Sequence, residues 1–132
     1  MVTPLSDLLR ASLTGVREVE VALELLHPMT APKAIEELSA ILDKEPIEHP
    51  IVVYVTNKEE WTKQKEQVPY IYDSPDVEGY ILQIRCGHNR VAILKRRGEK
   101  SIRALIFNNI EEATAECARQ NKWHKQRYGA LI

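Results

Sequence analysis

The period of the apolar residues changes repeatedly along this chain, and this alternation constrains its fold more than any other feature. In residues 16–25 apolar side chains alternate with glutamates, which is the two-residue period of a half-buried strand. In residues 32–44 they recur at helical spacing instead. The pattern predicts helices in residues 1–15, 32–44 and 58–67, from Gly87 to Gly98 and from Asn109 to Gly129, and strands in residues 16–25, 51–55, 80–85 and 102–107.

The fold class follows from the character of these strands. The strands predicted in residues 16–25 and 80–85 alternate, whereas the strands of a parallel doubly wound sheet are continuous apolar runs. Residues 51–55 are an apolar, β-branched run, which predicts a buried strand. We therefore expect an α+β (mixed α/β) fold, with a small mixed sheet covered by helices on one side. A length of 132 residues suits one domain, and no internal repeat divides it, so residues 1–132 are predicted to form a single domain.

The composition excludes several classes of protein. No apolar run approaches the roughly 20 residues that a membrane span requires. Asp7 and Arg10 interrupt the N-terminal apolar stretch, which is unlike a signal peptide. Cys86 and Cys117 are too few cysteines for a disulfide framework and fit a reducing compartment. We expect a cytoplasmic protein that has no membrane partner.

The charges are divided unequally along the chain. Residues 1–84 contain seven Lys and Arg against 15 Asp and Glu, and residues 85–132 contain 11 against four. This division predicts a dipolar molecule with one side that attracts anions. The alternative is that the two halves interleave in space and their charges mix.

The most informative segment is residues 80–107, where a strand, a turn, a short helix, a glycine and a second strand follow one another. The turn is Gly87-His88-Asn89-Arg90. A turn that enters a helix offers unpaired N–H groups and the positive end of the helix dipole, which favour an anion such as phosphate. Gly87 allows close approach, and Arg90 can clamp an anion bidentately. The alternative is a simple turn whose arginine pairs with a surface carboxylate.

This segment resembles the phosphate-binding box of the ParB/sulfiredoxin superfamily, with its Gly-x-x-Arg turn between a strand and an Ala-containing helix. Residues 19–28 are similar to the family's opening strand and leucine-x-proline turn, and residues 35–53 to its helix followed by a proline-and-valine strand. Residues 110–121 resemble the helix that carries a Glu-Asn pair in the partition proteins. The resemblance covers about residues 16–127.

The resemblance implies a pocket for a nucleoside triphosphate, such as CTP or ATP, with or without Mg²⁺. The residues that would bind the nucleotide and its phosphates are Gly87, His88, Asn89, Arg90 and Asn121. The residues of the loop that would close the pocket are His27, Pro28 and Lys33.

The chain departs from the family pattern in ways that bear on metal binding and turnover. Gln120 replaces the Glu of the Glu-Asn pair, which removes a carboxylate that Mg²⁺ favours. The loop arginine of the partition proteins is absent, and Lys33, its nearest substitute, cannot clamp bidentately. Residues 57–78 look like an insertion. A chain ending at Ile132 also has no room for the helix-turn-helix and dimerisation domains of a complete partition protein.

Other kinds of site are less well supported by the sequence. Sulfiredoxins carry a cysteine directly after the turn glycine, where this chain has His88, so Cys86 and Cys117 are expected to be buried hydrophobic residues. The four histidines show no metal-ligand spacing, and no metal site is predicted. The glutamates of residues 18–24 are expected to form a solvated strand face rather than to supply a general base.

A basic cluster follows the turn and comprises Lys95, Arg96, Arg97, Lys100 and Arg103. These residues would suit the backbone of a nucleic acid, and Trp123 and Tyr128 would add surface for stacking. If the final helix packs beside the short helix, its own basic residues extend the same surface. The alternative is that positive residues at a helix C-terminus simply stabilise its dipole.

Together these features predict a nucleotide-binding, ParB-like domain whose chemistry is NTP hydrolysis or DNA phosphodiester cleavage by a ParB-like nuclease. Arg90 and the turn amides would stabilise the charge that develops on the phosphate. The alternative is a non-enzymatic module that binds nucleic acid or a protein partner, encoded by a phage or plasmid. DNA is an expected partner whether the domain is an enzyme or a binding module. A homodimer is compatible with both alternatives.

Overall fold

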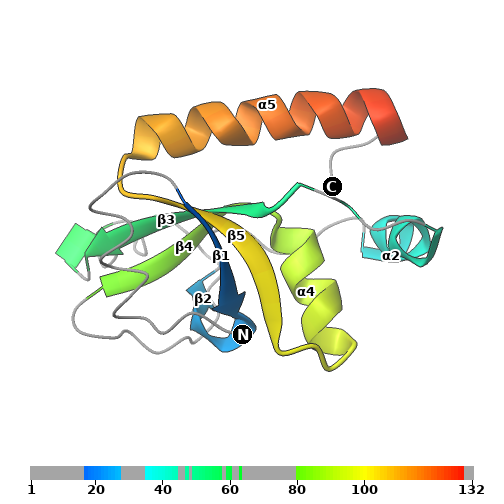
Figure 1. Ribbon diagram of the computed structural model, residues 1–132, viewed down its shortest axis with the longest axis horizontal. Helices are drawn as coiled ribbons and strands as arrows, with labels where there is room; N and C mark the ends of the chain where they lie inside the picture. The colour runs from blue at the N-terminus through cyan, green and yellow to red at the C-terminus, as the bar shows by residue number, and fades with distance from the viewer. Residues whose placement is uncertain are drawn as a thin grey trace.

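The computed structural model describes residues 17–27, 35–44, 47, 49–57, 59–60, 63 and 80–129. Its strands are β1 (Arg17–Ala22), β2 (Leu26–His27), β3 (Ile51–Asn57), β4 (Tyr80–Cys86) and β5 (Ser101–Phe107). Its helices are the 3-10 turn η1 (Leu23–Leu25), α2 (Ile35–Lys44), α4 (His88–Arg96) and α5 (Ile110–Tyr128). These elements form one small sheet with helices packed around it (Figure 1).

The sheet has five strands in the order β1-β5-β3-β4-β2. β1 and β5 pair antiparallel, as do β3 and β4, whereas β3 pairs parallel with β5 and β2 parallel with β4. A mixed sheet combined with helices is the α+β fold expected from the alternating periods, and that prediction is confirmed.

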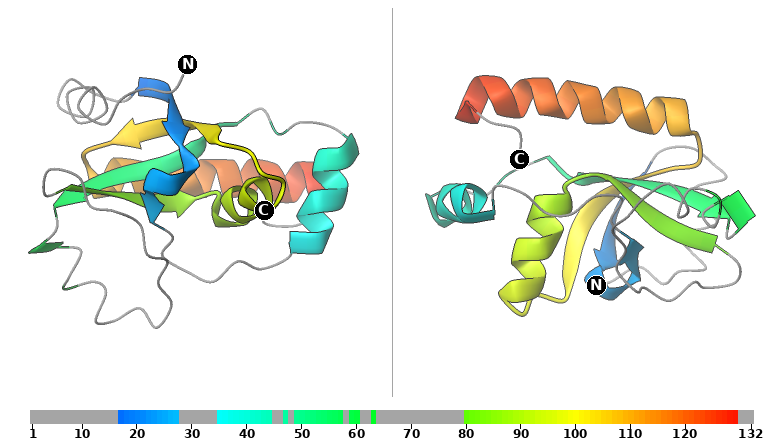
Figure 2. Two further views of the ribbon diagram at one scale, coloured as in Figure 1. Left: turned by 90° about the horizontal axis from the view of Figure 1, so that it is seen from below. Right: turned by 180° about the vertical axis from the view of Figure 1, so that it is seen from behind.

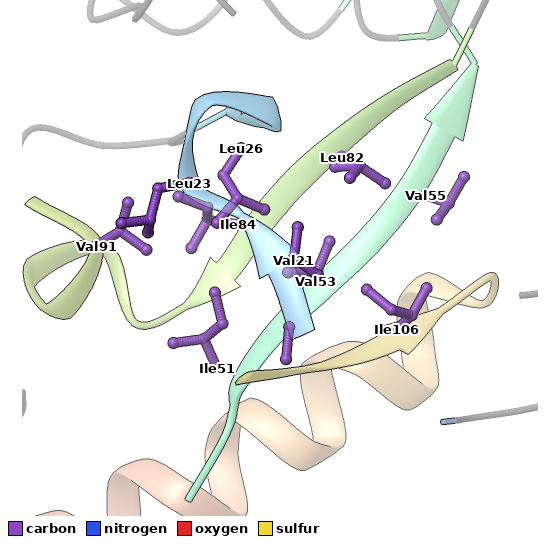
Figure 3. Packing of buried hydrophobic residues seen from close by; sticks show 11 residues of the cluster. Val21, Leu23, Leu26, Ile51, Val53, Val55, Leu82, Ile84, Val91 and Ile106 are labelled. Carbon is purple, nitrogen blue, oxygen red and sulfur yellow. The ribbon is translucent and has the colours of Figure 1, made fainter. Parts of the chain in front are cut away.

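Helices cover both faces of the sheet, and not one face as expected. Ile51, Val53 and Val55 of β3 belong to one core, which includes Val91 of α4 (Figure 3). The other face of the same strand buries Val52 and Tyr54 against Ala113 of α5. β3 is apolar on both faces because it is buried on both, so its sequence does not alternate. α4 and α5 therefore lie on opposite sides of the sheet (Figures 1 and 2).

The first strand ends earlier than its alternating pattern predicts. β1 stops at Ala22, and η1 then turns the chain into β2, where a loop was expected at His27. Leu23 in η1 is 2% exposed and its backbone N–H donates to the Lys100 carbonyl oxygen. The apolar period continues through the turn because Val21, Leu23 and Leu26 all enter the same core.

Several predicted helix ends are confirmed. Asn109 caps α5 by accepting a hydrogen bond from the Glu112 N–H, and Gly129 ends that helix in the left-handed region. Asn57 accepts one from the Glu60 N–H, which is the contact of a helix N-cap at the start of the helix predicted in residues 58–67. α2 packs against α4 through Leu38 and Ile93 at one end of the sheet (Figure 2).

Some predictions fall outside the described residues: the helix in residues 1–15, the loop residues Pro28 and Lys33, and most of the 57–78 insertion. Within the described residues, no helix is both long and apolar enough to cross a bilayer.

The turn between β4 and α4 depends on a glycine, which gives a first testable prediction. Gly87 has φ +106°, and a Cβ there would lie 2.8 Å from the Cβ of Ile51. We expect Gly87→Ala to lower the free energy of unfolding by about 3–5 kcal/mol, because backbone strain and overpacking add. Gly98→Ala is the control, because Gly98 has φ +78° with nothing within 4 Å of an added Cβ.

Urea denaturation of both variants measures the difference. The control should lose only about 1 kcal/mol, and equal losses in the two variants would contradict the close packing of Gly87 on Ile51.

Candidate functional site

The Gly87–Arg90 turn is where the candidate site begins. Gly87 is the N-cap of α4, and Arg90 lies in the first helical turn. The guanidinium folds back beneath the glycine, since its Nη2 would lie 3.5 Å from a Cβ added to Gly87. Its Nη1 donates a hydrogen bond to the carbonyl oxygen of His49, in the segment that leads into β3. Arg90 thus connects the start of α4 to the start of β3.

Arg90 is buried and incompletely satisfied. It is 4% exposed, and its Nε and Nη2 have no hydrogen-bond partner among the described residues. The ion pairs of those residues join other arginines to carboxylates. Burial lowers the pKa of Arg90, although a guanidinium stays protonated in proteins. No carboxylate of the described residues forms an ion pair with this buried cation, so an anion placed here would be stabilised.

A cavity of about 160 Å³ opens beside this guanidinium. Its lining residues are Leu42, Ile47, His49, Pro50, Arg90, Leu94, Ile102 and Arg103. The polar side chains of this lining are one imidazole and two guanidiniums, and the remaining side chains are apolar. The cavity therefore brings Arg90 of the phosphate-binding prediction together with Arg103 of the basic cluster.

An irregularity in β4 shapes the other side of the site. The pairing of β3 with β4 shifts register between Val52 and Val53, so Cys86 pairs with Val52 while Ile84 pairs with Val53. Two residues two positions apart normally share a face, but this bulge sends them to opposite faces. Ile84 enters the core on the α4 side, and Cys86 enters the core beneath α5.

The two cysteines meet across that interface as free thiols. The Cys86 thiol donates weakly to the side-chain oxygen of Asn121, at 3.6 Å, and Cys117 donates to the Arg85 carbonyl oxygen at 3.1 Å. A hydrogen bond with Cys117, followed by burial, raises the pKa of Cys86, and the same bond lowers the pKa of Cys117. Cys86 is buried as expected, and Cys117 is half-buried against the same core.

α5 buries polar side chains where an ordinary helix would bury apolar ones. Its buried residues are Ala113, Gln120 and His124. The Gln120 amide donates to the Pro50 carbonyl oxygen at 2.9 Å. His124 is fully buried, and neither ring nitrogen has a hydrogen-bond partner among the described residues. Burial, then the charges of Arg90 and His49, lowers the pKa of His124 to about 4.

Aromatic rings surround His124 at the C-terminal end of α5. The His49 ring lies 4.5 Å from the Trp123 ring and 5.6 Å from the His124 ring, between centroids. Tyr128 lies 6.1 Å from His124 and 5.9 Å from Trp123. Trp123 is 38% exposed, so this cluster connects the buried site to the surface.

The structure separates the sequence-predicted phosphate ligands. Gly87 and Arg90 lie together, and His88 and Asn89 occupy the first turn of α4 between them. Burial, then the nearby Arg85 charge, lowers the pKa of His88 to about 4, so at neutral pH this ring is not a cation for phosphate. The Asn121 side chain contacts the two thiols.

The basic cluster is partly neutralised, and the expected continuous positive surface does not form. Arg97 pairs with Asp43 of α2 at 2.9 Å, and Arg103 lies 3.6 Å from Glu18 of β1. The basic residues of α5 lie on the opposite side of the sheet from α4, so they do not extend the cluster (Figure 1). The acidic and basic halves of the chain interleave at these pairs, as the alternative interpretation of the charge division required.

The sequence did not predict His49 or His124 as residues of the site, and it indicated Gln120 only as a departure from a family pattern. A signal for the α5 pair existed, because Cys117, Gln120 and His124 recur at three- and four-residue spacing on one helix face. No sequence signal could locate His49, since its role depends on the carbonyl oxygen that it presents to Arg90. No cluster of three or more potential metal ligands occurs in the part of the chain that the structure describes.

The Gln120 contact gives a prediction about charge. Replacing Gln120 by Glu puts a buried carboxylate against the Pro50 carbonyl oxygen, where only a donor fits. We expect Gln120→Glu to lower the free energy of unfolding at pH 8 by about 2–3 kcal/mol. The loss should shrink toward pH 5, because a buried carboxyl has a raised pKa and its protonated form can donate again.

Urea denaturation at both pH values measures this effect. Gln126→Glu, an exposed position on the same helix, is the control and should change stability little at either pH. A pH-independent loss in Gln120→Glu would show that the amide's donor role is not what stabilises this contact.

The cysteine pair gives a prediction about reactivity. Because the thiolate is the reactive form, the lowered pKa and partial exposure of Cys117 should make it react before Cys86. Timed alkylation with iodoacetamide at pH 7.5, followed by peptide mass spectrometry, should find Cys117 modified first. Selective modification of Cys86 with Cys117 spared would contradict the assignment and point to a reactive thiol beside the turn.

Comparisons with known proteins leave the family open. No protein-family model matches this chain, and no curated protein matches it in sequence.

Proposed function

We propose that the Gly87–Arg90 turn binds the phosphate of a nucleotide, and that the chain is a stand-alone nucleotide-binding domain of the ParB/sulfiredoxin type. The observation that carries this proposal is the buried Arg90 guanidinium, with two nitrogens that have no partner among the described residues. A phosphate would accept hydrogen bonds from both and would neutralise the buried charge.

The backbone supports the same ligand. α4 has nine residues, and its N-terminus meets the guanidinium at Gly87. The first-turn N–H groups of a helix have no partner within the helix, and its dipole favours an anion there. A side chain at Gly87 would clash with Ile51, so glycine allows the turn to pack closely against β3 with the Arg90 guanidinium beside it.

The cavity volume bears on how a nucleotide would bind. At about 160 Å³ it is smaller than the several hundred Å³ of a typical ligand pocket. One phosphate group would fit beside Arg90, and the rest of the nucleotide would lie outside this cavity.

Binding without turnover is the form of this function that we favour. The Gln120 amide is engaged with the Pro50 carbonyl oxygen, at the position where the resemblance expects a glutamate that assists Mg²⁺. Two free thiols support a cytoplasmic location. Lys95, Arg96 and Lys100 remain exposed candidates for contact with DNA.

The test is thermal melting with ATP, CTP and pyrophosphate, each with and without Mg²⁺. A ligand at 100 times its Kd stabilises by about 2.7 kcal/mol, a shift that is readily measured. Arg90→Ala should abolish the shift. Arg90→Lys keeps the charge without the planar fork, so it should retain a reduced shift and guards against misfolding of the alanine variant.

Arg96→Ala removes an exposed arginine from the same helix and is the matched control, with an unchanged shift expected. If none of the three ligands shifts the melting temperature, the phosphate-binding turn is refuted. A shift that survives in Arg90→Ala places the anion elsewhere.

A further inference from the structure

Two buried polar side chains, from helices on opposite sides of the sheet, both have nitrogen atoms without a hydrogen-bond partner among the described residues. Arg90 of α4 is 4% exposed and His124 of α5 is 0% exposed, and both have ring or guanidinium nitrogens without a partner among the described residues. Unpartnered buried polar atoms are rare in folded proteins, so each of them requires an explanation. Here two of them occur in one place.

The segment before β3 brings the two side chains together. Arg90 donates to the backbone carbonyl of His49, and the His49 ring lies 5.6 Å from the His124 ring. One residue further along, the Pro50 carbonyl accepts from Gln120, which lies one turn before His124 on α5. The Arg90 charge is close enough to act on the His124 imidazole.

We infer that His124 is a second ligand of the anion bound at Arg90, and that binding of the anion transfers a proton from solvent to His124. This inference rests on the proposed function and adds to it a ligand from α5 and a dependence on pH. An imidazolium has two N–H donors, and an anion between His124 and Arg90 would accept from both residues.

The charges around His124 give the sign of the effect. His124 is faced by Arg90 from α4, by His49 from the segment before β3, and by the rings of Trp123 and Tyr128 on its own helix. The positive guanidinium and the burial favour the neutral imidazole, in agreement with a pKa of about 4. A bound anion reverses the local potential and raises that pKa.

Linkage then sets the direction of the pH dependence. Between the pKa of the free site and that of the bound site, binding takes up one proton, so affinity rises as pH falls, by at most tenfold per pH unit. If the bound pKa is 6 or higher, affinity increases at least tenfold between pH 7.5 and pH 5. Above the bound pKa, the affinity is independent of this histidine.

Sulfate is the probe, because it remains a dianion across this range and contributes no titration of its own. Its Kd is measured at constant ionic strength from pH 7.5 to pH 5, by calorimetry and by tryptophan fluorescence, since Trp123 adjoins His124. NMR titration of the His124 ring, with and without sulfate, measures the pKa of this histidine in the free and the bound site. Two variants test the site: His124→Gln, which cannot take up a proton, and Arg90→Lys. Lys125→Gln is the control, because it removes an exposed charge from the same helix.

The expected result is an affinity for sulfate that rises at least tenfold on acidification in the parent and in Lys125→Gln. His124→Gln should bind at pH 7.5 and lose the rise, and the NMR pKa of His124 should increase from about 4 to above 6 when sulfate binds. Near-ultraviolet circular dichroism confirms that the variants are folded.

Three results overturn the inference. If sulfate binds in an Arg90-dependent way with no pH dependence, the proposed phosphate site stands and the role of His124 is wrong. If the pH dependence survives in His124→Gln, another group takes up the proton. If sulfate does not bind at any pH, the phosphate site itself fails, and the inference fails with it.

Discussion

Two consecutive backbone carbonyls, those of His49 and Pro50, connect the parts of this molecule that form the site. The first accepts from Arg90 of α4, and the second accepts from Gln120 of α5. These helices lie on opposite sides of the sheet (Figure 1), and the segment before β3 lies where both can reach it. Buried carbonyls need partners, and here long side chains supply them in place of a neighbouring strand. This arrangement fixes the Arg90 guanidinium by one nitrogen, and its other two nitrogens have no hydrogen-bond partner among the described residues.

The bulge in β4 has consequences on both sides of the same junction. By turning Cys86 toward α5, it brings a small side chain under the helix at the level of Gln120 and Asn121. It also sets the direction in which the chain leaves the sheet, and Gly87 then passes so close to Ile51 that no side chain fits there. A regular strand would have placed Cys86 in the core beside Ile84, on the α4 side. The position of the turn thus depends on one extra residue in the ladder.

Periodicity predicted most of the fold because burial on one face leaves a regular signature in a sequence. It succeeded for β3, β4, β5, α4 and α5, and the continuous apolar run of β3 correctly indicated a buried strand. It missed the layer arrangement, because the pattern does not tell which face of the sheet each helix covers. It also extended the first strand through η1, where burial of Leu23 preserves the pattern although the backbone turns. For the site, the Gly-x-x-Arg spacing found Gly87 and Arg90, since both belong to one local motif. His49 and His124 were not predicted, because they approach Arg90 through tertiary contacts and not through a fixed spacing in the sequence.

The electrostatic character of the site follows from which polar groups are buried there. A glutamine at position 120 donates to a carbonyl, whereas an ionised glutamate would compete with any incoming anion for the same positive potential. His88 and His124 are held neutral by burial and by nearby arginines. Because Arg103 is paired with Glu18, the buried positive charge of the site comes from the guanidinium of Arg90. A neutral imidazole beside a buried cation is a group that can gain a proton once that cation is paired. The same burial that destabilises the Arg90 charge therefore makes the protonation of His124 responsive to the charge of a ligand.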